Sequence, residues 1–234
     1  MTTARSDFLA SSATVAALLE IERGYQDPPP QSDQAAVEGL RGGAVVIVVA
    51  ALESYLKESI AEVLDRINNA NPPCDFAKLP IDIQTRAVYT GLYAAMKPKP
   101  WDPIQDHQLR LPGVLLAVQR INKREIMSSE IADTAGNPNS AQVKSIFKIV
   151  GLPAVFSNVK PGFDAMWGTP TATTFIQNML DTVVRMRHTV AHTASIRSIS
   201  RTDIANWHRF LNTFVTVIDA ALERHIARII SRAQ

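Results

Sequence analysis

Apolar residues recur at helical spacing through most of this chain, and that periodicity restricts the fold more than any other feature of the sequence. The alternation of apolar and polar residues that marks β-strands is scarce. With 234 residues, of which 46% are hydrophobic, the chain is long enough to bury a substantial core. We therefore expect an all-α protein that forms a single domain over residues 1–234.

Prolines divide the N-terminal part of the sequence. A first helix is expected over about residues 7–25, and the run of three prolines at 28–30 ends it because consecutive prolines cannot continue a helix. Residues 1–31 are thus interpreted as an N-terminal helix with a proline-rich linker, and residues from about 32 to 234 as the core.

The second predicted helix is long, from a cap at Ser32 or Asp33 to about Asn69, with a weak point at Gly42-Gly43. Its most apolar stretch, residues 44–52, has about half of the roughly 20 residues that a membrane span requires. We expect a buried helix here and no membrane partner.

The remaining helices are predicted from caps and breaks. Asn139 or Ser140 caps one of them, and Ser200 with Asp203 resembles a capping box at the start of the last one. The short segment between the final two helices predicts that they pack antiparallel. The prolines in residues 74–112 leave only short helices there, and residues 161–170 read as a loop. The helices are expected over about residues 80–96, 113–126, 141–152, 171–192 and 201–232.

Composition limits the cellular setting. The single cysteine, Cys74, excludes an intramolecular disulfide and a thiolate zinc cluster, which favours the reducing cytoplasm. The formal net charge of +2 neither requires nor opposes a nucleic-acid partner. Charge alone therefore decides nothing about function.

Two arginines and two histidines gather at the end of the penultimate predicted helix, at positions 185, 187, 188 and 192. Arginine presents a planar fork suited to phosphate oxygens, and histidine exchanges protons near neutral pH. Arg187 and His192 lie about 140° apart around an ideal helix and about 7.5 Å apart along it, so they share only the edge of a helix face. Pairing with the same segment of a second subunit would gather four such groups.

Other interpretations of this segment were weighed. Cations at a helix C-terminus also interact favourably with the helix dipole without catalysis. His188 and His192, four residues apart, form a metal-binding pair only with a third ligand, which the sequence does not offer, so we predict neither metal nor cofactor. Asp181 and Arg185 are expected to form a solvated pair.

The stretch RHTVAH at residues 187–192 resembles the arginine-polar-x-x-x-histidine motif of the HEPN superfamily. Three further stretches are similar to its RiboL-PSP and MAE-like branch: AALESYLKESIAEVLD, GNPNSAQVKSIFKIVGL and SISRTDIANWHRFLNTFVTVIDAAL. They occur in the family's order over about residues 50–222. The chain departs from the pattern at Thr193, where the family often has glycine.

The resemblance implies a helical bundle with long antiparallel core helices and a metal-independent endoribonuclease activity. In that activity His192 is the general base for a ribose 2′-OH, Arg187 binds the scissile phosphate, and His188 orients or polarises its neighbours. The products would carry 2′,3′-cyclic phosphate and 5′-OH ends. A non-catalytic HEPN-like module that binds RNA or a protein remains the alternative.

The resemblance also implies a homodimer with a composite active site, and a toxin or defence role with a restraining partner such as an antitoxin. Glu53 and Tyr55 border the cleft if the second helix packs against the motif helix; otherwise they are a solvated carboxylate and a ring at the core edge.

Residues outside this motif receive no catalytic role. Surface positions are expected for three histidines, packing roles for the three tryptophans, and a solvated cationic stripe for three arginines of the last helix. These residues are His107, His208 and His225; Trp101, Trp167 and Trp207; and Arg224, Arg228 and Arg232.

Overall fold

The computed structural model describes residues 1–97, 106–132, 137–193 and 199–234, without the side chains of His107, Glu130 and Thr193. The described residues form helices joined by turns, and they contain no β-strand. The helices are α1 (Thr3–Arg23), α2 (Gln34–Asn68), the 3-10 turn η1 (Phe76–Lys78), α3 (Ile81–Met96), α4 (His107–Asn122), α5 (Ser128–Ile131), α6 (Ser140–Ile149), α7 (Val155–Trp167), α8 (Phe175–Thr193) and α9 (Arg201–Ala233).

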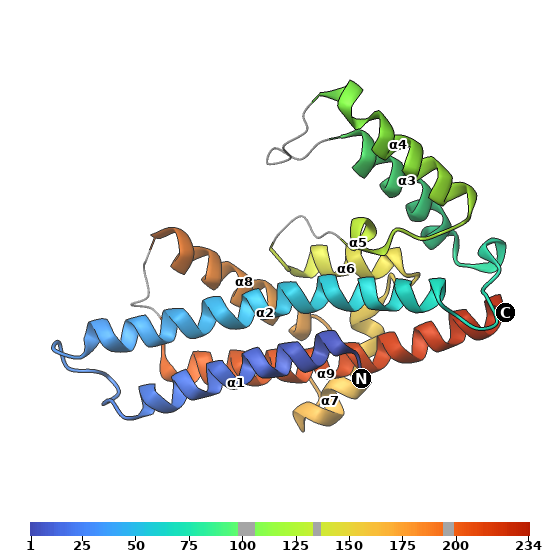
Figure 1. Cartoon of the computed structure of the whole chain (residues 1–234). Coiled ribbons are helices and arrows are strands. Elements are labelled where there is room, and N and C mark those ends of the chain that lie inside the picture. Colours follow the sequence, from blue (N-terminus) through green and yellow to red (C-terminus); the bar gives the residue numbers. More distant parts are fainter. Residues whose placement is uncertain (98–105, 133–136, 194–198) are drawn as a thin grey trace.

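Long helices α1, α2 and α9 lie side by side, and α8 and α6 cover α2 on one side of this layer (Figure 1). Helix α1 runs antiparallel to α2 and α9, and α8 also runs against α9. The all-α bundle with long antiparallel helices is confirmed. Phe8 and Val15 of α1 belong to the same hydrophobic cluster as the side chains of α2, α8 and α9.

Helix α2 is continuous through Gly42 and Gly43 and buries the predicted apolar stretch. Val45, Val49 and Leu52 are almost fully buried, because they follow one face of the helix at intervals of three and four residues. By length and composition α2 would also suit a membrane span, and it is the one such helix in the described part of the chain. Half of its most apolar window is buried against the other helices.

Several predicted helix boundaries are confirmed. Asp33 precedes α2, and Asn139 caps α6 by accepting a hydrogen bond from the amide of Gln142 at 2.9 Å. Ser200 and Asp203 form the expected capping box at the start of α9. Much of the segment between α8 and α9 lies outside the described residues.

Two proline positions correct the sequence prediction. Residues 161–167, expected to be a loop, belong to α7, although Pro161 cannot donate to the helix. Val155, Val159 and Phe163 are buried along one face of α7, and this packing outweighs the missing hydrogen bond. Helix α4 starts at His107, before Pro112 rather than after it, because Asp106 caps it by accepting from the amide of Gln108 at 2.8 Å.

A buried ion network fixes the ends of α1, α2 and α9 near the segment that follows α8. Glu22 is 1% exposed and accepts from Arg41 at 2.5 and 2.8 Å and from Arg201 at 2.7 Å. Arg41 also donates to the carbonyl of Ile199 at 3.1 Å. The start of α9 is thereby tied to the two N-terminal helices.

Candidate active site at the end of α8

Helix α8 passes from the core to the surface within its own length. Leu180 and Val183 are fully buried, whereas Arg185, His188 and His192 are exposed. The apolar stripe stops where the cationic segment begins, so the segment that sequence analysis singled out is presented to solvent.

Arg187 is half-buried at this boundary. Its Nη1 donates to the side-chain oxygen of Asn137, which precedes α6, at 3.4 Å. Its Nε is buried and has no hydrogen-bond partner among the described residues. A buried donor left without a partner costs free energy. The guanidinium thus has an unsatisfied donor, which an anionic group would satisfy if a small movement of the side chain brought the Nε to the surface.

Asp181, one and a half turns earlier, holds the segment that carries Asn137. Its two carboxylate oxygens accept from the backbone amide and the hydroxyl of Ser140 at 2.7 and 2.8 Å. Within that segment the amide of Asn139 donates to the carbonyl of Asn137 at 2.7 Å. Asp181 thus binds the start of α6 instead of forming the solvated pair predicted with Arg185.

A hollow of about 420 Å³ lies between the start of α6 and α8. Its size falls in the range of small-molecule sites and suits one nucleotide unit. It is lined by Asn137, Asn139, Ser140, Ala141, Asp181, Val184, Arg185 and His188. Asn137 therefore bonds to the guanidinium of Arg187 and also lines the hollow, as His188 does.

His188 and His192 lie together, as their spacing of four residues predicts. Their ring centroids are 4.3 Å apart and the rings are inclined by 51°. Both side chains are exposed, so a substrate and solvent can reach them. The arrangement offers two imidazoles for proton transfer beside a permanent cation. Among the described residues, no three or more histidine, cysteine, aspartate or glutamate side chains are grouped to share a metal ion.

Glu53 and Tyr55 do not line the hollow. Tyr55 is 1% exposed and its ring packs edge-on against Phe8 of α1. Burial, and then the nearby Asp219 carboxylate, raise the pKa of Tyr55 well above its ordinary value, so the phenol stays neutral. Glu53 is partly exposed and has no hydrogen bond or ion pair with a described residue.

Two of the other histidines correct the expectation of surface positions. His208 is half-buried and bonds to the hydroxyl of Ser12 at 2.7 Å, and His225 bonds to the carbonyl of Val150 at 2.8 Å. His107 is the first residue of α4, and its side chain lies outside the described part of the structure.

Two tryptophans have the expected packing roles. Trp167 stacks on Phe163, and Trp207 is 7% exposed. Trp101 lies outside the described residues.

Sequence reasoning missed Asn137 and the anchoring role of Asp181. The signal for both was the Asn137-Pro138-Asn139-Ser140 segment, in which short polar side chains precede a helix. Its contact with a helix more than 40 residues later has no signature in a single sequence.

Comparison with known families gives one match. The family model described as RiboL-PSP-HEPN matches residues 14–224, a span that includes the Asn137 segment and all of α8. No curated protein and no solved structure matches the chain.

Proposed function

From the premise that the chain belongs to the RiboL-PSP-HEPN family, we propose that it is a metal-independent endoribonuclease. HEPN domains are generally associated with RNA cleavage. The observation that carries the proposal is the exposed pair His188 and His192 on the helical turn that also carries the half-buried Arg187, whose Nε has no hydrogen-bond partner among the described residues. His188 lines the hollow, and Arg187 reaches its wall through Asn137, so a phosphate-binding cation and proton-transfer groups lie on one segment beside it.

The proposed reaction uses the ribose 2′-OH as nucleophile. His192 accepts its proton while the 2′-oxygen bonds to the adjacent phosphorus. The phosphorus–O5′ bond breaks, and the 5′-oxygen takes up a proton from solvent water as it leaves, giving 2′,3′-cyclic phosphate and 5′-OH ends. Arg187 stabilises the charge on the phosphorane, and His188 orients His192 through the contact between their rings. DNA lacks the nucleophile and would not be cleaved.

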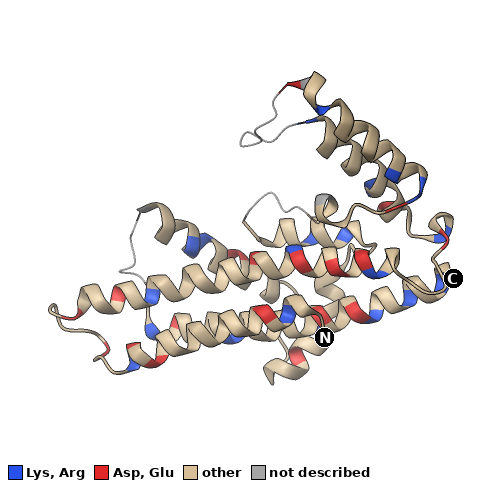
Figure 2. Cartoon of the chain, viewed as in Figure 1, with Lys and Arg blue, Asp and Glu red and all other residues tan. Residues whose placement is uncertain are grey.

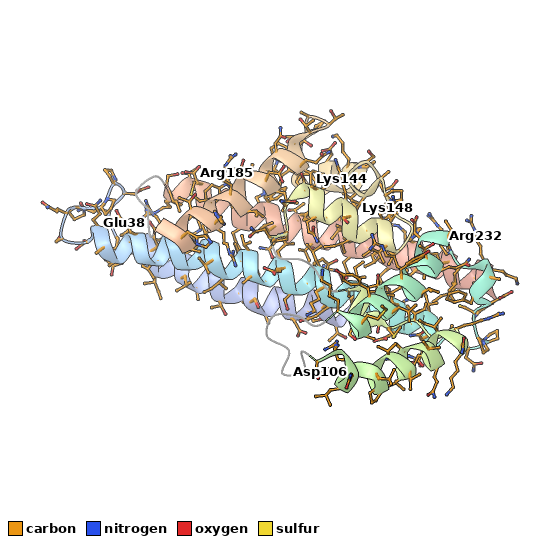
Figure 3. The ribbon with its side chains drawn as sticks, turned by 90° about the horizontal axis from the view of Figure 1, so that it is seen from above. Glu38, Asp106, Lys144, Lys148, Arg185 and Arg232 are labelled. Atoms are coloured by element: carbon orange, nitrogen blue, oxygen red, sulfur yellow. The ribbon has the colours of Figure 1, made fainter. Side chains whose placement is uncertain are left out.

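Cations beside the hollow support binding of an RNA backbone. Arg185 lines it, and Lys144 and Lys148 are exposed on the neighbouring helix α6. Figure 3 shows Arg185, Lys144 and Lys148 in succession along the molecule. Phosphate contacts of this kind bind any sequence, so they would position the strand without selecting it.

The composite site is proposed on the same grounds. Within one chain Arg187 bonds to Asn137, while His192 contacts His188. A second copy facing this segment would bring two guanidiniums and four imidazoles into one cleft. We propose a homodimer in which both motif segments face this cleft.

The proposed cellular role is that of a cytoplasmic toxin or defence effector. Unrestrained RNA cleavage harms the host cell, so such an enzyme requires a restraining partner, for example an antitoxin. Expression of the wild type in a bacterial host is expected to arrest growth, whereas His192→Ala is tolerated. Equal toxicity of both proteins would contradict this role.

The test of the activity uses purified full-length protein, total cellular RNA and excess EDTA. Arg187→Ala is expected to reduce cleavage by about 10²–10³-fold and His192→Ala by about 10²–10⁴-fold. Arg224→Ala, which removes an exposed cation of α9, is the matched control and should retain full activity. Fragment ends are identified by their sensitivity to enzymes that open cyclic phosphates.

One outcome would replace the proposal. Because Arg187 bonds to Asn137 rather than to His192, the chain also fits a non-catalytic HEPN-like module that binds RNA or a protein. If the wild type is as inert as both variants but still binds RNA or a protein, the binding module is the correct reading.

A further inference from the structure

Helices α3 and α4 form a hairpin, here called the arm, that projects from the bundle (Figure 1). The arm carries most of the large hydrophobic side chains that the described residues leave exposed, with exposed fractions between 39% and 72%. These are Ile81, Tyr89, Tyr93, Met96, Leu109, Leu111, Leu115, Leu116 and Val118. The described remainder of the chain adds only Met1, Leu9, Ile21 and Met166.

The exposed side chains follow the spacing of a buried helix face. Tyr89, Tyr93 and Met96 on α3 are four and three residues apart, and so are Leu111, Leu115 and Val118 on α4. The opposite faces of the two helices are already used, since Ile83, Ala87 and Ala117 are buried. Each helix of the arm therefore has apolar residues on two faces, only one of which is covered.

The exposed apolar faces approach the size of a stable interface. The six side chains on the two faces just described expose together on the order of 700 Å², from ordinary side-chain sizes and their exposed fractions. Leu109 and Leu116 lie on another side of α4 and are not counted. The largest apolar patch on a typical monomer is about 300–600 Å², and a standard interface buries about 800 Å² on each partner. The two faces together exceed the first value and come close to the second.

The charges of the arm favour a second copy over an acidic or basic partner. Residues 87–96 and 111–119 contain no charged side chain, and Figure 2 shows Lys, Arg, Asp and Glu only toward the ends of the arm. A twofold axis places the same surface patch on both sides of an interface. An uncharged patch can meet itself without like-charge repulsion, and a second copy is present wherever the chain is made.

The arm is also held in place before any partner binds. A Cβ atom at Gly91 would lie 1.7 Å from the terminal methyl carbon of Met127, so α3 passes directly over that buried side chain. Within the arm, the guanidinium of Arg110 on α4 donates to the carbonyls of Ala94 and Ala95 on α3 at 3.1 Å and so joins the two helices. A fixed arm loses little entropy on association.

We infer that two copies of this chain pair through their arms, with α3 and α4 of each forming an intermolecular four-helix bundle. The inference does not rest on nuclease activity. In Figure 1 the arm and α8 both lie above α2, and Figure 3, seen from above, shows them on opposite sides of α2. A twofold axis that pairs the arms would have to cross above α2 for the two motif segments to face each other as well.

The first experiment measures the mass of the full chain by light scattering after gel filtration, at tens of micromolar. The wild type is expected at twice the chain mass and the double variant Tyr93→Arg, Leu115→Arg at one chain mass. The matched control Ile21→Arg, Met166→Arg replaces equally exposed apolar residues outside the arm and should stay dimeric. A monomeric wild type, or a dimeric arm variant, overturns the inference.

A second experiment avoids charged substitutions. Cys74 is the single cysteine, so Cys74→Ser gives a background without thiols. In that background Tyr93→Cys should form a disulfide-linked dimer when a mild oxidant removes two electrons and two protons from the two thiols, and Met166→Cys should not. Equal cross-linking of both variants would contradict arm pairing.

RNA cleavage by the same samples separates this inference from the proposed function. Loss of the dimer in the arm variant, with an inert wild type, supports arm pairing and contradicts the nuclease. An active dimer that the arm variant leaves intact supports the nuclease and contradicts arm pairing. If the arm variant is monomeric and still cleaves RNA, arm pairing and the nuclease are both supported, and only the proposal of a composite cleft is contradicted.

Discussion

Asp181 shows how much one residue determines in this site. Its carboxylate was expected to face solvent beside Arg185, and instead it accepts two hydrogen bonds from Ser140. Through Ser140 it fixes the segment in which Asn137 accepts from Arg187. The orientation of Arg187, the candidate phosphate-binding residue, therefore depends on a carboxylate that it does not itself contact.

Asp181→Ala removes both hydrogen bonds and leaves the Ser140 amide without its partner. The free energy of unfolding should fall by about 1–3 kcal/mol, the range for a bond to a charged acceptor. Urea titration followed by circular dichroism measures it. Asn178→Ala, at an exposed position of the same helix, should cost far less, and an equal loss for both would argue against the anchoring role.

His208 gives the fold a dependence on pH. Burial lowers the pKa of His208 below its ordinary value of 6.5, despite the hydrogen bond to the Ser12 backbone. His208 therefore binds a proton less readily in the folded state than in the unfolded state. Its contribution to the free energy of unfolding should be fully present above pH 6.5 and should be lost as the pH drops from 6.5 through the lowered pKa. His208→Gln should flatten this slope in urea titrations between pH 7.5 and 5. An unchanged slope would show that other groups cause the pH dependence of stability.

At the scale of a helix, α7 shows that packing can outweigh a local breaker. Pro161 lies in its interior and leaves one backbone carbonyl without a donor, yet the helix continues to Trp167 and ends at Gly168. Gly168 has φ of +92°, which glycine adopts without strain. The buried face of α7 supplies the energy that the missing bond does not.

Pro161→Ala should therefore stabilise the protein. The side chain is exposed, so the substitution loses no packing and restores an amide donor. We expect the free energy of unfolding to rise by about 1–3 kcal/mol, with a higher Tm in calorimetry. Pro153→Ala, in the turn before α7, restores no helical bond and should not raise the Tm. A lower Tm for Pro161→Ala would mean that the helix needs the proline.

At the scale of the whole molecule, Glu22 joins three helices at one end of the bundle. Its carboxylate binds Arg41 of α2 and Arg201 of α9 while it is itself in α1. The start of α9, which follows the candidate site in the sequence, lies at the same end of the molecule. Helices distant in the sequence are thereby held in a fixed relation.

Glu22→Ala would leave Arg201 without its anion and Arg41 with only the more exposed carboxylate of Asp27. Removal of one partner of a buried ion pair costs about 3–5 kcal/mol. Glu20→Ala breaks the exposed pair with Arg23 in the same helix and should cost less than about 1 kcal/mol. Chemical denaturation compares the two variants. A similar, small cost for both would show that the buried network does not stabilise the fold.

Sequence patterns predicted the helical class, the boundaries of α2, α3 and α9, and the cationic segment at the end of α8. These features depend on local signals: the spacing of apolar residues, caps such as Asn139 and Ser200, and the family motif at residues 187–192. A local signal acts through neighbouring backbone atoms, so a single sequence reveals it. Pro161 misled the prediction because a breaker is local, while the packing that overrides it is not.

Which side chains meet follows from tertiary packing. It joined Arg187 to Asn137 and Asp181 to Ser140, placed Tyr55 in the core, and left the arm with an uncovered apolar face. These relations depend on how each helix is rotated and where it crosses its neighbours. That geometry follows from the combined packing of the core, whose buried contacts link segments far apart in the sequence.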